Sequence, residues 1–394
     1  MRSVDYDLII AGGGLAGLLS AKEAASRGLS VAVIEEDLEI GVPDKCDGLV
    51  SMNALMRLGI IPTSRSVQNT IKRVILYPPN GRPVEADTSS LKMVVLDRSI
   101  FDKEIARRAA SKGADMMLGE RVTLAVEEEG CVRVESNRSL RSKIYVEAKG
   151  TSALPAERQR SLIPAARYDV EAKWIQEDTI EIYVDNAKYP GFFLWVIPTS
   201  EDSAKVGVAG RSINCFTRLD EFLEQRGGRV IKKVSAPIYV GGPIERLVRG
   251  RIMVAGDSAG QTKPSTGGGI YSCGLAGILS GQAAANYILD GKRDALEEYA
   301  QRWLHLFKED FKITLQARRI YEKMDNRCIE KLFNLIREKN LVNEILQSGD
   351  FDEHSKWVRR FLGIKDVMKV FSIVAAEEVK HLVKQANDFL TQRR

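Results

Sequence analysis

The sequence has few of the side chains that bind metals or form disulfide bonds. Its 394 residues include five cysteines and three histidines. The cysteines are scattered and odd in number, and the sequence contains neither a Cys-x-x-Cys pair nor a cluster of cysteine with histidine. This usage argues against a structural zinc site and indicates a reducing compartment. We therefore expect a protein without a bound metal.

A hydrophobic run with the composition of a membrane span is also missing. One stretch, residues 264–289, has no charge, but it is rich in glycine, serine, glutamine and asparagine. It predicts a loop and a helix buried in protein rather than in lipid. The first ten residues lead directly into a strand and not into a signal peptide. We expect a cytoplasmic protein, with peripheral membrane contact through its helical C-terminal third as an open alternative.

Charge of one sign is not in large excess. The chain has 58 basic and 53 acidic residues, a net charge of +5, and the two signs are interleaved. A nucleic-acid partner is therefore not expected. With 44% hydrophobic and 28% charged residues, the composition excludes a collagen-like or broadly disordered chain and indicates a globular protein of two or three domains.

The N-terminal residues have the pattern of a strand, a helix and a second strand. Residues 6–10 form a short apolar run, residues 15–27 have apolar side chains at helical spacing and stop at Gly28, and residues 30–34 form a second apolar run. Between the first strand and the helix, residues 12–17 read Gly-Gly-Gly-Leu-Ala-Gly, which is a Gly-x-Gly-x-x-Gly motif.

This motif predicts a dinucleotide site. Gly12 allows the tight turn, Gly14 lets the backbone approach a pyrophosphate, and Gly17 lets the helix pack closely on the sheet. Glu35 ends the second strand eighteen residues past Gly17. At that position a carboxylate can accept hydrogen bonds from ribose hydroxyl groups.

A second glycine-rich stretch favours FAD over NAD. Residues 251–255 predict a buried strand that ends at Gly256-Asp257, and three glycines at 267–269 open a helix at Ile270. Asp257 can bind a ribityl hydroxyl, and the glycine run offers backbone N–H groups to the edge of a flavin ring. Because the two glycine-rich elements lie 240 residues apart, a long dinucleotide such as FAD fits them better than NAD.

The rest of the chain mixes predicted strands with a few helices. A helix is expected over residues 99–113, and helix dominates from about residue 295. Strands are expected over residues 74–77, 92–96, 132–136, 143–147, 171–174, 179–184, 191–197 and 205–209.

Three further stretches resemble the archaeal geranylgeranyl reductase family, within the p-hydroxybenzoate hydroxylase-like flavoproteins. Residues 41–48, Gly-Val-Pro-Asp-Lys-Cys-Asp-Gly, resemble the Pro-x-x-Cys-x-Gly segment that this family places beside the flavin. Residues 97–102, Asp-Arg-Ser-Ile-Phe-Asp, resemble a segment whose arginine lies at the cofactor phosphates. Residues 193–198, followed by Gly207, resemble the substrate motif Tyr-x-Trp-x-Phe-Pro…Gly-x-Gly. The resemblance covers residues 5 to about 290.

The resemblance implies an α/β fold with a Rossmann-type FAD-binding domain, a mostly antiparallel sheet domain for the substrate and a helical C-terminal region. The expected limits are 1–70, 97–165 and 245–294 for the FAD-binding domain, 71–96 and 166–244 for the substrate domain, and 295–394 for the helical domain.

The resemblance also implies a set of site residues. Cys46 and Asp47 are the expected catalytic residues, and Phe193, Trp195 and Pro198 the expected substrate wall. A buried structural cysteine and an ordinary core strand are the alternatives for these two groups. The residues expected to bind FAD are Gly12, Gly14, Ala16, Gly17, Glu35, Cys46, Asp47, Leu49, Arg98, Val122, Asp257, Gly267, Gly269 and Ile270.

The glycine-rich elements predict an FAD-dependent enzyme, and the resemblance implies a reductase that saturates C=C bonds of geranylgeranyl chains, with a prenyl lipid precursor of archaeal membranes as substrate. The electron donor is left open among NAD(P)H, ferredoxin and a quinol. One alternative is an FAD-dependent monooxygenase or halogenase, because halogenases of this fold have a Trp-x-Trp-x-Ile-Pro motif that residues 193–198 partly share. Another is a non-catalytic carrier of prenyl lipids that keeps FAD for its structure.

Overall fold

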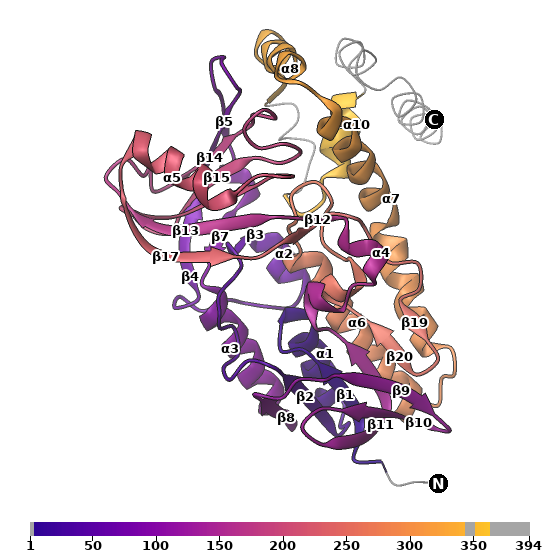
Figure 1. The fold of residues 1–394 in the computed structure, drawn as a ribbon. Helices are drawn as coiled ribbons and strands as arrows, with labels where there is room; N and C mark the ends of the chain where they lie inside the picture. Colours follow the sequence, from indigo (N-terminus) through magenta and orange to yellow (C-terminus); the bar gives the residue numbers. More distant parts are fainter. Residues whose placement is uncertain (1–3, 343–350, 363–394) are drawn as a thin grey trace.

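The computed structural model describes residues 4–342 and 351–362, and the following description concerns this part of the chain (Figure 1). In Figure 1 a largely parallel sheet lies near the N-terminus and an antiparallel sheet lies at the opposite end. The long helix α7 (Ala295–Lys323) runs along both. This arrangement confirms the predicted fold class, an α/β protein with a Rossmann-type region, antiparallel sheets and a helical C-terminal region.

The first sheet has eight strands, with the order β19-β20-β11-β1-β2-β8 and the strands β10 and β9 added beside β11. Its strands are β1 (Tyr6–Ala11), β2 (Val31–Glu35), β8 (Ala114–Leu118), β9 (Leu124–Glu128), β10 (Cys131–Glu135), β11 (Ser139–Glu147), β19 (Val248–Arg249) and β20 (Ile252–Val254). The five strands from β20 to β8 are all parallel. This is the sheet of a nucleotide-binding fold.

Both faces of this parallel sheet are buried. Leu8 and Ile10 of β1 belong to a core shared with α1 (Leu15–Ser26), α6 (Ile270–Leu289) and α7. Ile9 and Ala11 point to the other face, into a core shared with β10. A strand that is buried on both faces reads as a continuous apolar run, as residues 6–10 do.

The second sheet has seven strands in the order β17-β13-β16-β15-β14-β5-β6, and only the pair β14–β5 is parallel. Its strands are β5 (Arg73–Tyr77), β6 (Val84–Asp87), β13 (Ala165–Glu171), β14 (Thr179–Tyr183), β15 (Leu194–Pro198), β16 (Ser203–Ala209) and β17 (Arg229–Ser235). Helix α5 (Cys215–Arg226) covers one face. The other face contributes Phe192, Trp195 and Ile197 to a separate apolar cluster.

Smaller elements join the two sheets. A three-stranded sheet contains β3 (Leu49–Ser51), β7 (Met93–Leu96) and β4 (Val67–Ile71), and a two-stranded sheet contains β12 (Leu162–Ile163) and β18 (Ile238–Tyr239). The remaining helices are α2 (Met52–Arg57), α3 (Arg98–Ala110), α4 (Ala156–Gln159), α8 (Asn326–Glu338) and α10 (Ser355–Leu362). The short 3-10 helices are η1 (Ser89–Leu91), η2 (Gly150–Ala153) and η3 (Gly256–Ala259).

Most predicted elements are confirmed, but one predicted strand is wrong. Residues 171–174 do not continue a strand, because β13 ends at Glu171. Trp174 instead turns away, so that its Nε1–H donates to the carbonyl of Gly227 at 2.9 Å and its ring lies 4.4 Å from the Arg226 guanidinium. The indole contacts outweigh strand propensity here. Helix α5 was not expected from the sequence, nor were the strands β3, β4, β6, β8, β9, β12, β17, β18, β19 and most of β13.

The predicted division into three domains stays a prediction. Within the described residues, no helix combines the length and the apolar composition needed to cross a bilayer. The uncharged stretch 264–289 forms a loop and helix α6, and twelve residues of α6 are buried against neighbouring elements.

Helix α6 packs on α1 through glycines. A Cβ atom at Gly277 would lie 2.1 Å from the carbonyl oxygen of Ala16, and one at Gly281 would lie 2.3 Å from that of Ser20. Ser280 and Ser20 join their hydroxyl groups at 3.0 Å in the same contact. Small residues on α6 therefore set how closely it approaches the helix that begins at the glycine turn.

We predict that Gly277→Ala lowers the free energy of unfolding by about 1–3 kcal/mol, because the new methyl group meets rigid backbone and forces the helices apart. Gly274→Ala is the matched control: its Cβ would meet only the side-chain ends of Leu58 and Leu19, at 2.9 and 3.3 Å. We expect the control to lose clearly less stability in urea titrations. Equal losses in the two variants would contradict the close-packing account.

Candidate functional site

The glycine turn between β1 and α1 leaves room for a ligand at one position only. Gly12 has a φ of +108°, and a Cβ there would lie 2.3 Å from the carbonyl oxygen of Ala148. A Cβ at Gly17 would lie 2.0 Å from the carbonyl oxygen of Gly12. At Gly14, in contrast, no atom lies within 4 Å of the Cβ position. Gly12 and Gly17 thus serve the packing of the turn, whereas Gly14 borders open space at the N-terminus of a helix.

Glu35 stands beside this turn at the end of β2. Its carboxylate accepts hydrogen bonds from the backbone N–H groups of Gly13 and Asp37, the latter at 3.0 Å. The carbonyl of Glu35 accepts the N–H of Glu120 at 2.9 Å, which brings the buried Val122 close to the same strand end. These residues surround the predicted place of the ribose, and their role in binding it stays a prediction.

The second glycine-rich element lies against the first helix as well. Asp257 follows β20 in η3, is half-buried, and accepts a hydrogen bond from the Cys273 thiol at 3.4 Å. Burial raises the pKa of Asp257, while Cys273 and Arg98 oppose this rise. A Cβ at Gly269 would lie 3.7 Å from the Asp257 carboxylate. The aspartate and the glycine run therefore lie side by side, and their binding of a flavin chain and ring stays a prediction.

Residues 41–48 run along the start of α3. A Cβ at Gly41 would lie 2.9 Å from the Cα of Ser99, and one at Gly48 would lie 2.1 Å from the carbonyl oxygen of Leu96. Arg98, the first residue of α3, donates two hydrogen bonds to Asp102 at 3.0 and 2.9 Å. Burial acts to lower the pKa of Arg98, but Asp102 and the Cys46 thiol together raise it. Arg98 and Cys46 are thus brought together, and Arg98 Nη1 is free of the Asp102 contact.

Two buried cations from the seven-stranded sheet hold residues 44–47. Arg167 of β13 donates to the carbonyl oxygen of Cys46 at 2.8 Å and to that of Asp44 at 3.2 Å. Lys205 of β16 donates to the carbonyl oxygens of Cys46 at 3.3 Å and Asp47 at 3.1 Å. Both cationic side chains are 4% exposed. We call this set of contacts the Arg167–Lys205 clamp.

The clamp also neutralises carboxylates. Arg167 lies 3.3 Å from the Asp44 carboxylate and 3.7 Å from that of Asp47. Burial raises the pKa of Asp47, and the positive charges of Arg167 and Lys205 only partly oppose this rise. The Trp195 indole is also close enough to Asp47 to stabilise its charged form. Its Nε1–H is buried and has no well-aligned hydrogen-bond partner among the described residues. Asp47 therefore stands between the clamp and the aromatic wall.

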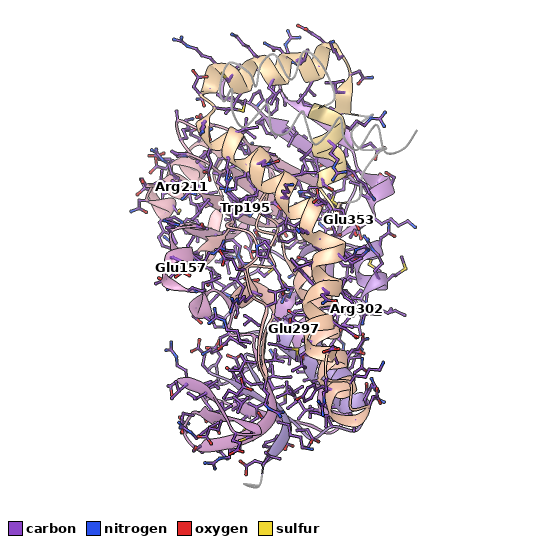
Figure 2. All side chains as sticks on the ribbon, turned by 90° about the vertical axis from the view of Figure 1, so that its right-hand side faces the viewer. Glu157, Trp195, Arg211, Glu297, Arg302 and Glu353 are labelled. Carbon is purple, nitrogen blue, oxygen red and sulfur yellow. The ribbon has the colours of Figure 1, made fainter. Side chains whose placement is uncertain are left out.

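The aromatic wall is a packed surface of three rings. Phe192 and Phe193 stack with ring centres 4.3 Å apart, and Phe193 meets Trp195 edge-on at 5.8 Å. Trp195 pairs with Gly207 across β15 and β16. A Cβ at Gly207 would lie 2.3 Å from the indole ring, so the glycine makes room for it. Trp195 is 7% exposed and lies near the centre of Figure 2.

The remaining predicted residues lie around these groups. Ile270 opens α6 in the same apolar cluster as Leu15 and Cys46. Leu49 begins β3 beside the cluster of Trp195. Pro198 ends β15, where its carbonyl accepts a hydrogen bond from Asn69 at 3.0 Å, apart from the ring contacts of the wall. The assignment of all these residues to FAD or to substrate stays a prediction.

Sequence reasoning missed several residues of this site. Arg167 and Lys205 are single cations within apolar strands, and that pattern was the available signal. Lys263 and His354 were also missed: Lys263 donates to the carbonyl of Phe351 at 3.1 Å, and Ser265 bonds His354 at 2.8 Å. These contacts attach the C-terminal part of the chain to the loop that precedes the glycine run.

The chain is similar in sequence and in fold to several known proteins. Residues 7–203 match a family model described as lycopene cyclase protein. A geranylgeranyl bacteriochlorophyll reductase-like protein from Thermoplasma acidophilum has a TM-score of 0.78 at 24% identity, over 96% of this chain and 98% of that one. A p-nitrophenol 4-monooxygenase from Pseudomonas putida has a TM-score of 0.68 at 17% identity, over 96% and 99% of the two chains. A flavin-dependent brominase also reaches 0.68, at 18% identity over 95% and 100%. The protein therefore has the fold of the flavin-dependent oxidoreductases.

Sequence relatives identify the family within that class. Digeranylgeranylglycerophospholipid reductase 2 of Methanopyrus kandleri is 29% identical over 97% of this chain and 100% of its own length. Digeranylgeranylglycerophospholipid reductase of Methanoculleus marisnigri is 32% identical over 76% of this chain and 82% of its own length. The chain belongs to the digeranylgeranylglycerophospholipid reductase family.

The clamp generates a prediction about pH. In the folded protein Asp47 holds its proton more tightly than in the unfolded chain, so its burial costs stability as the pH rises above the unfolded pKa of about 3.9. Arg167→Gln removes one opposing positive charge and raises the pKa of Asp47 further. We expect a loss of about 3 kcal/mol at pH 8 and a smaller loss at pH 5, measured by urea unfolding at both values.

Arg229→Gln is the control for this variant. Arg229 lies in the neighbouring strand β17, and its side chain is 74% exposed in an ion pair with Glu171. We expect this control to change stability by less than about 1 kcal/mol at either pH. If the loss in Arg167→Gln did not grow between pH 5 and pH 8, Asp47 would not be the acid that the clamp balances.

Proposed function

We propose that the protein is an FAD-dependent reductase that saturates C=C bonds of geranylgeranyl chains in precursors of archaeal membrane lipids. The observation that carries the proposal is similarity over nearly the whole chain to a protein named digeranylgeranylglycerophospholipid reductase. The positions of Cys46, Asp47 and the aromatic wall support it, because they place polar groups beside a large apolar surface.

The residues present fit FAD. The open Cβ position at Gly14 leaves space for the pyrophosphate at the start of α1, and Glu35 would bind the ribose next to it. Asp257 would bind the ribityl chain, and the N–H groups of residues 267–269 would face the ring. When bound and reduced, FAD supplies the hydride that alkene saturation requires.

The chain itself would supply the proton. Addition of a hydride to one alkene carbon requires a proton at the other, and the candidate acids are Asp47, which lies beside Trp195, and its chain neighbour Cys46. Burial raises the pKa of Asp47, and a raised pKa favours the protonated form that a general acid needs. We propose Asp47 and Cys46 as the candidate donors, with Arg167 and Lys205 as positioning residues.

The aromatic wall would bind the prenyl chain. Phe193 is half-buried, and its ring stacks on Phe192 and meets Trp195 edge-on. A flat apolar surface of this kind favours hydrocarbon over polar substrates. Because a prenyl lipid has to be collected from a bilayer, we also propose peripheral contact of the protein with a membrane.

The alternative is an oxygen-using monooxygenase or halogenase of the same fold. The solved structures with these activities are 17–18% identical to this chain, and that level of identity shows the fold alone. The two functions differ in the oxidant that takes electrons from reduced flavin, and one experiment separates them.

We predict that the purified holoprotein, reduced with dithionite without oxygen, is reoxidised faster when a geranylgeranyl lipid is added. Flavin absorbance reports the rate, and mass spectrometry of the lipid reports two added hydrogen atoms per reduced bond. A fully saturated phytanyl lipid is the control and should leave the flavin reduced. If only oxygen reoxidises the flavin, the protein is an oxygenase or a carrier.

A second prediction concerns the proton donor. We expect Cys46→Ser to keep its FAD but to slow single-turnover flavin oxidation by the geranylgeranyl lipid about tenfold or more, because a serine hydroxyl is a far weaker acid than a thiol. Cys46→Ala shows whether the side chain only packs. Equal rates in wild type and both variants would assign proton donation to Asp47 instead. In that case Asp47→Asn should slow single-turnover flavin oxidation.

A further inference from the structure

A polar cavity lies against the second half of α7. Its volume is about 880 Å³, and its other walls come from α4 and its flanks, the segment 240–249 and Arg211, which follows β16. None of the residues predicted to bind FAD or the prenyl chain line it. In Figure 2, Glu157 and Arg211 of this cavity lie on one side of α7. We call it the arginine pocket.

The arginine pocket concentrates positive charge. Seven arginines and three glutamates line it, which leaves four excess positive charges, whereas the whole chain has a net charge of only +5. In the described part of the chain, five of the arginines form no ion pair within 4.0 Å: Arg158, Arg160, Arg246, Arg249 and Arg319. Exposed arginines of a solvated surface are usually interleaved with acids, so this excess indicates an anionic ligand.

The floor of the pocket is also short of negative charge. Arg211 and Arg318 share a single carboxylate, that of Glu322, at 3.0 and 3.1 Å. The side chain of Arg318 is 4% exposed. Burial and the like charge of Arg211 lower the pKa of Arg318 to about 10, although Glu322 opposes this shift. An anion bound above these groups would relieve the repulsion between them.

Arg318 connects the pocket to the candidate active site. It donates to the carbonyl of Pro264 at 3.1 Å, just before the glycine run, and to that of Gly191 at 2.6 Å, just before the wall. Its guanidinium lies 5.1 Å from the centre of the Phe192 ring. Val240 lines the pocket and also belongs to the apolar cluster of Trp195. A phosphate held in the pocket would therefore lie next to residues that pack directly against the apolar cluster of the wall.

We propose that the arginine pocket binds the phosphate group of an organic phosphate that takes part in the reaction. Guanidinium groups bind phosphate oxygens through two parallel hydrogen bonds, and several of them in one cavity suit a phosphate ester or diester. Two reactants have this chemistry: the headgroup of a prenyl phospholipid and a nicotinamide dinucleotide donor. The contact of Val240 with the apolar cluster favours the headgroup. The inference rests on the proposed function for the identity of the lipid.

The test removes two exposed arginines of the pocket. Arg160→Gln combined with Arg246→Gln lowers the charge without touching Arg318, which holds backbone carbonyls. Arg293→Gln combined with Arg302→Gln is the matched control, because both residues lie in or beside the first half of α7. Arg302 is sixteen residues from Arg318, about 24 Å along the helix, and Figure 2 shows it lower on α7.

Binding is measured on the oxidised holoprotein, by calorimetry at low salt, with geranylgeranyl phosphate, geranylgeraniol, NADP+ (which cannot reduce the flavin) and inorganic phosphate as probes. We expect the pocket variant to weaken geranylgeranyl phosphate at least tenfold, with geranylgeraniol unchanged and the control variant like wild type. A loss for NADP+ alone supports the pocket and assigns it to a nicotinamide donor. The proposal is overturned if geranylgeranyl phosphate and NADP+ each bind the pocket variant as tightly as they bind wild type.

This design separates the two claims of function. Because no turnover occurs, a protein that binds the prenyl phosphate through the pocket but never reduces it keeps the inference and loses the proposed function. If the wild type reduces the lipid but the pocket variant binds the phosphate ligands normally, the proposed function is kept and the inference about the pocket is lost. Flavin content and thermal unfolding of both variants show that each is folded.

Discussion

The site depends on the hydrogen bonds and ion pairs that Arg167 and Lys205 form with residues 44–47. The segment belongs to the nucleotide-binding side of the molecule, and the two cations belong to the antiparallel sheet. Two cations that are 4% exposed need anionic or carbonyl partners, and the segment provides both. The clamp therefore fixes the sheet to the loop and at the same time sets where Cys46 and Asp47 stand.

Other contacts complete the arrangement from three directions. The glycines of α6 bring that helix close to α1, so that the two predicted nucleotide-binding turns share one region. Gly207 makes room for the Trp195 indole, which turns its N–H toward Asp47. Lys263 and Ser265 bind residues 351–354 of the C-terminal part. Arg318, at the edge of the arginine pocket, donates hydrogen bonds to the carbonyl of Pro264 before the glycine run and to that of Gly191 before the wall. The predicted flavin site, the aromatic wall and the arginine pocket are thus joined by direct contacts.

The sequence was sufficient for features that depend on local patterns. The strand-turn-helix at the N-terminus, the glycine run before α6 and about half of the strands follow from periodicity and from glycine positions. The clamp could not be predicted, because it joins Arg167 and Lys205 to residues more than 120 positions away along the chain. The strand expected at 171–174 failed for a related reason, since the tertiary contacts of Trp174 with Gly227 and Arg226 override its β-propensity. The arginine pocket collects residues from four separate segments, none of which forms a motif.

The central claim is that the clamp places Cys46 and Asp47 where the flavin ring meets the prenyl chain. A crystal structure of the FAD-bound protein tests it most directly. The account predicts an isoalloxazine ring in contact with both the Cys46–Gly48 segment and the glycine run 267–269, with the clamp intact. A ring that contacts the glycine run but lies away from Cys46 and Asp47, or a 44–47 segment released from Arg167 and Lys205 in the bound state, would contradict it.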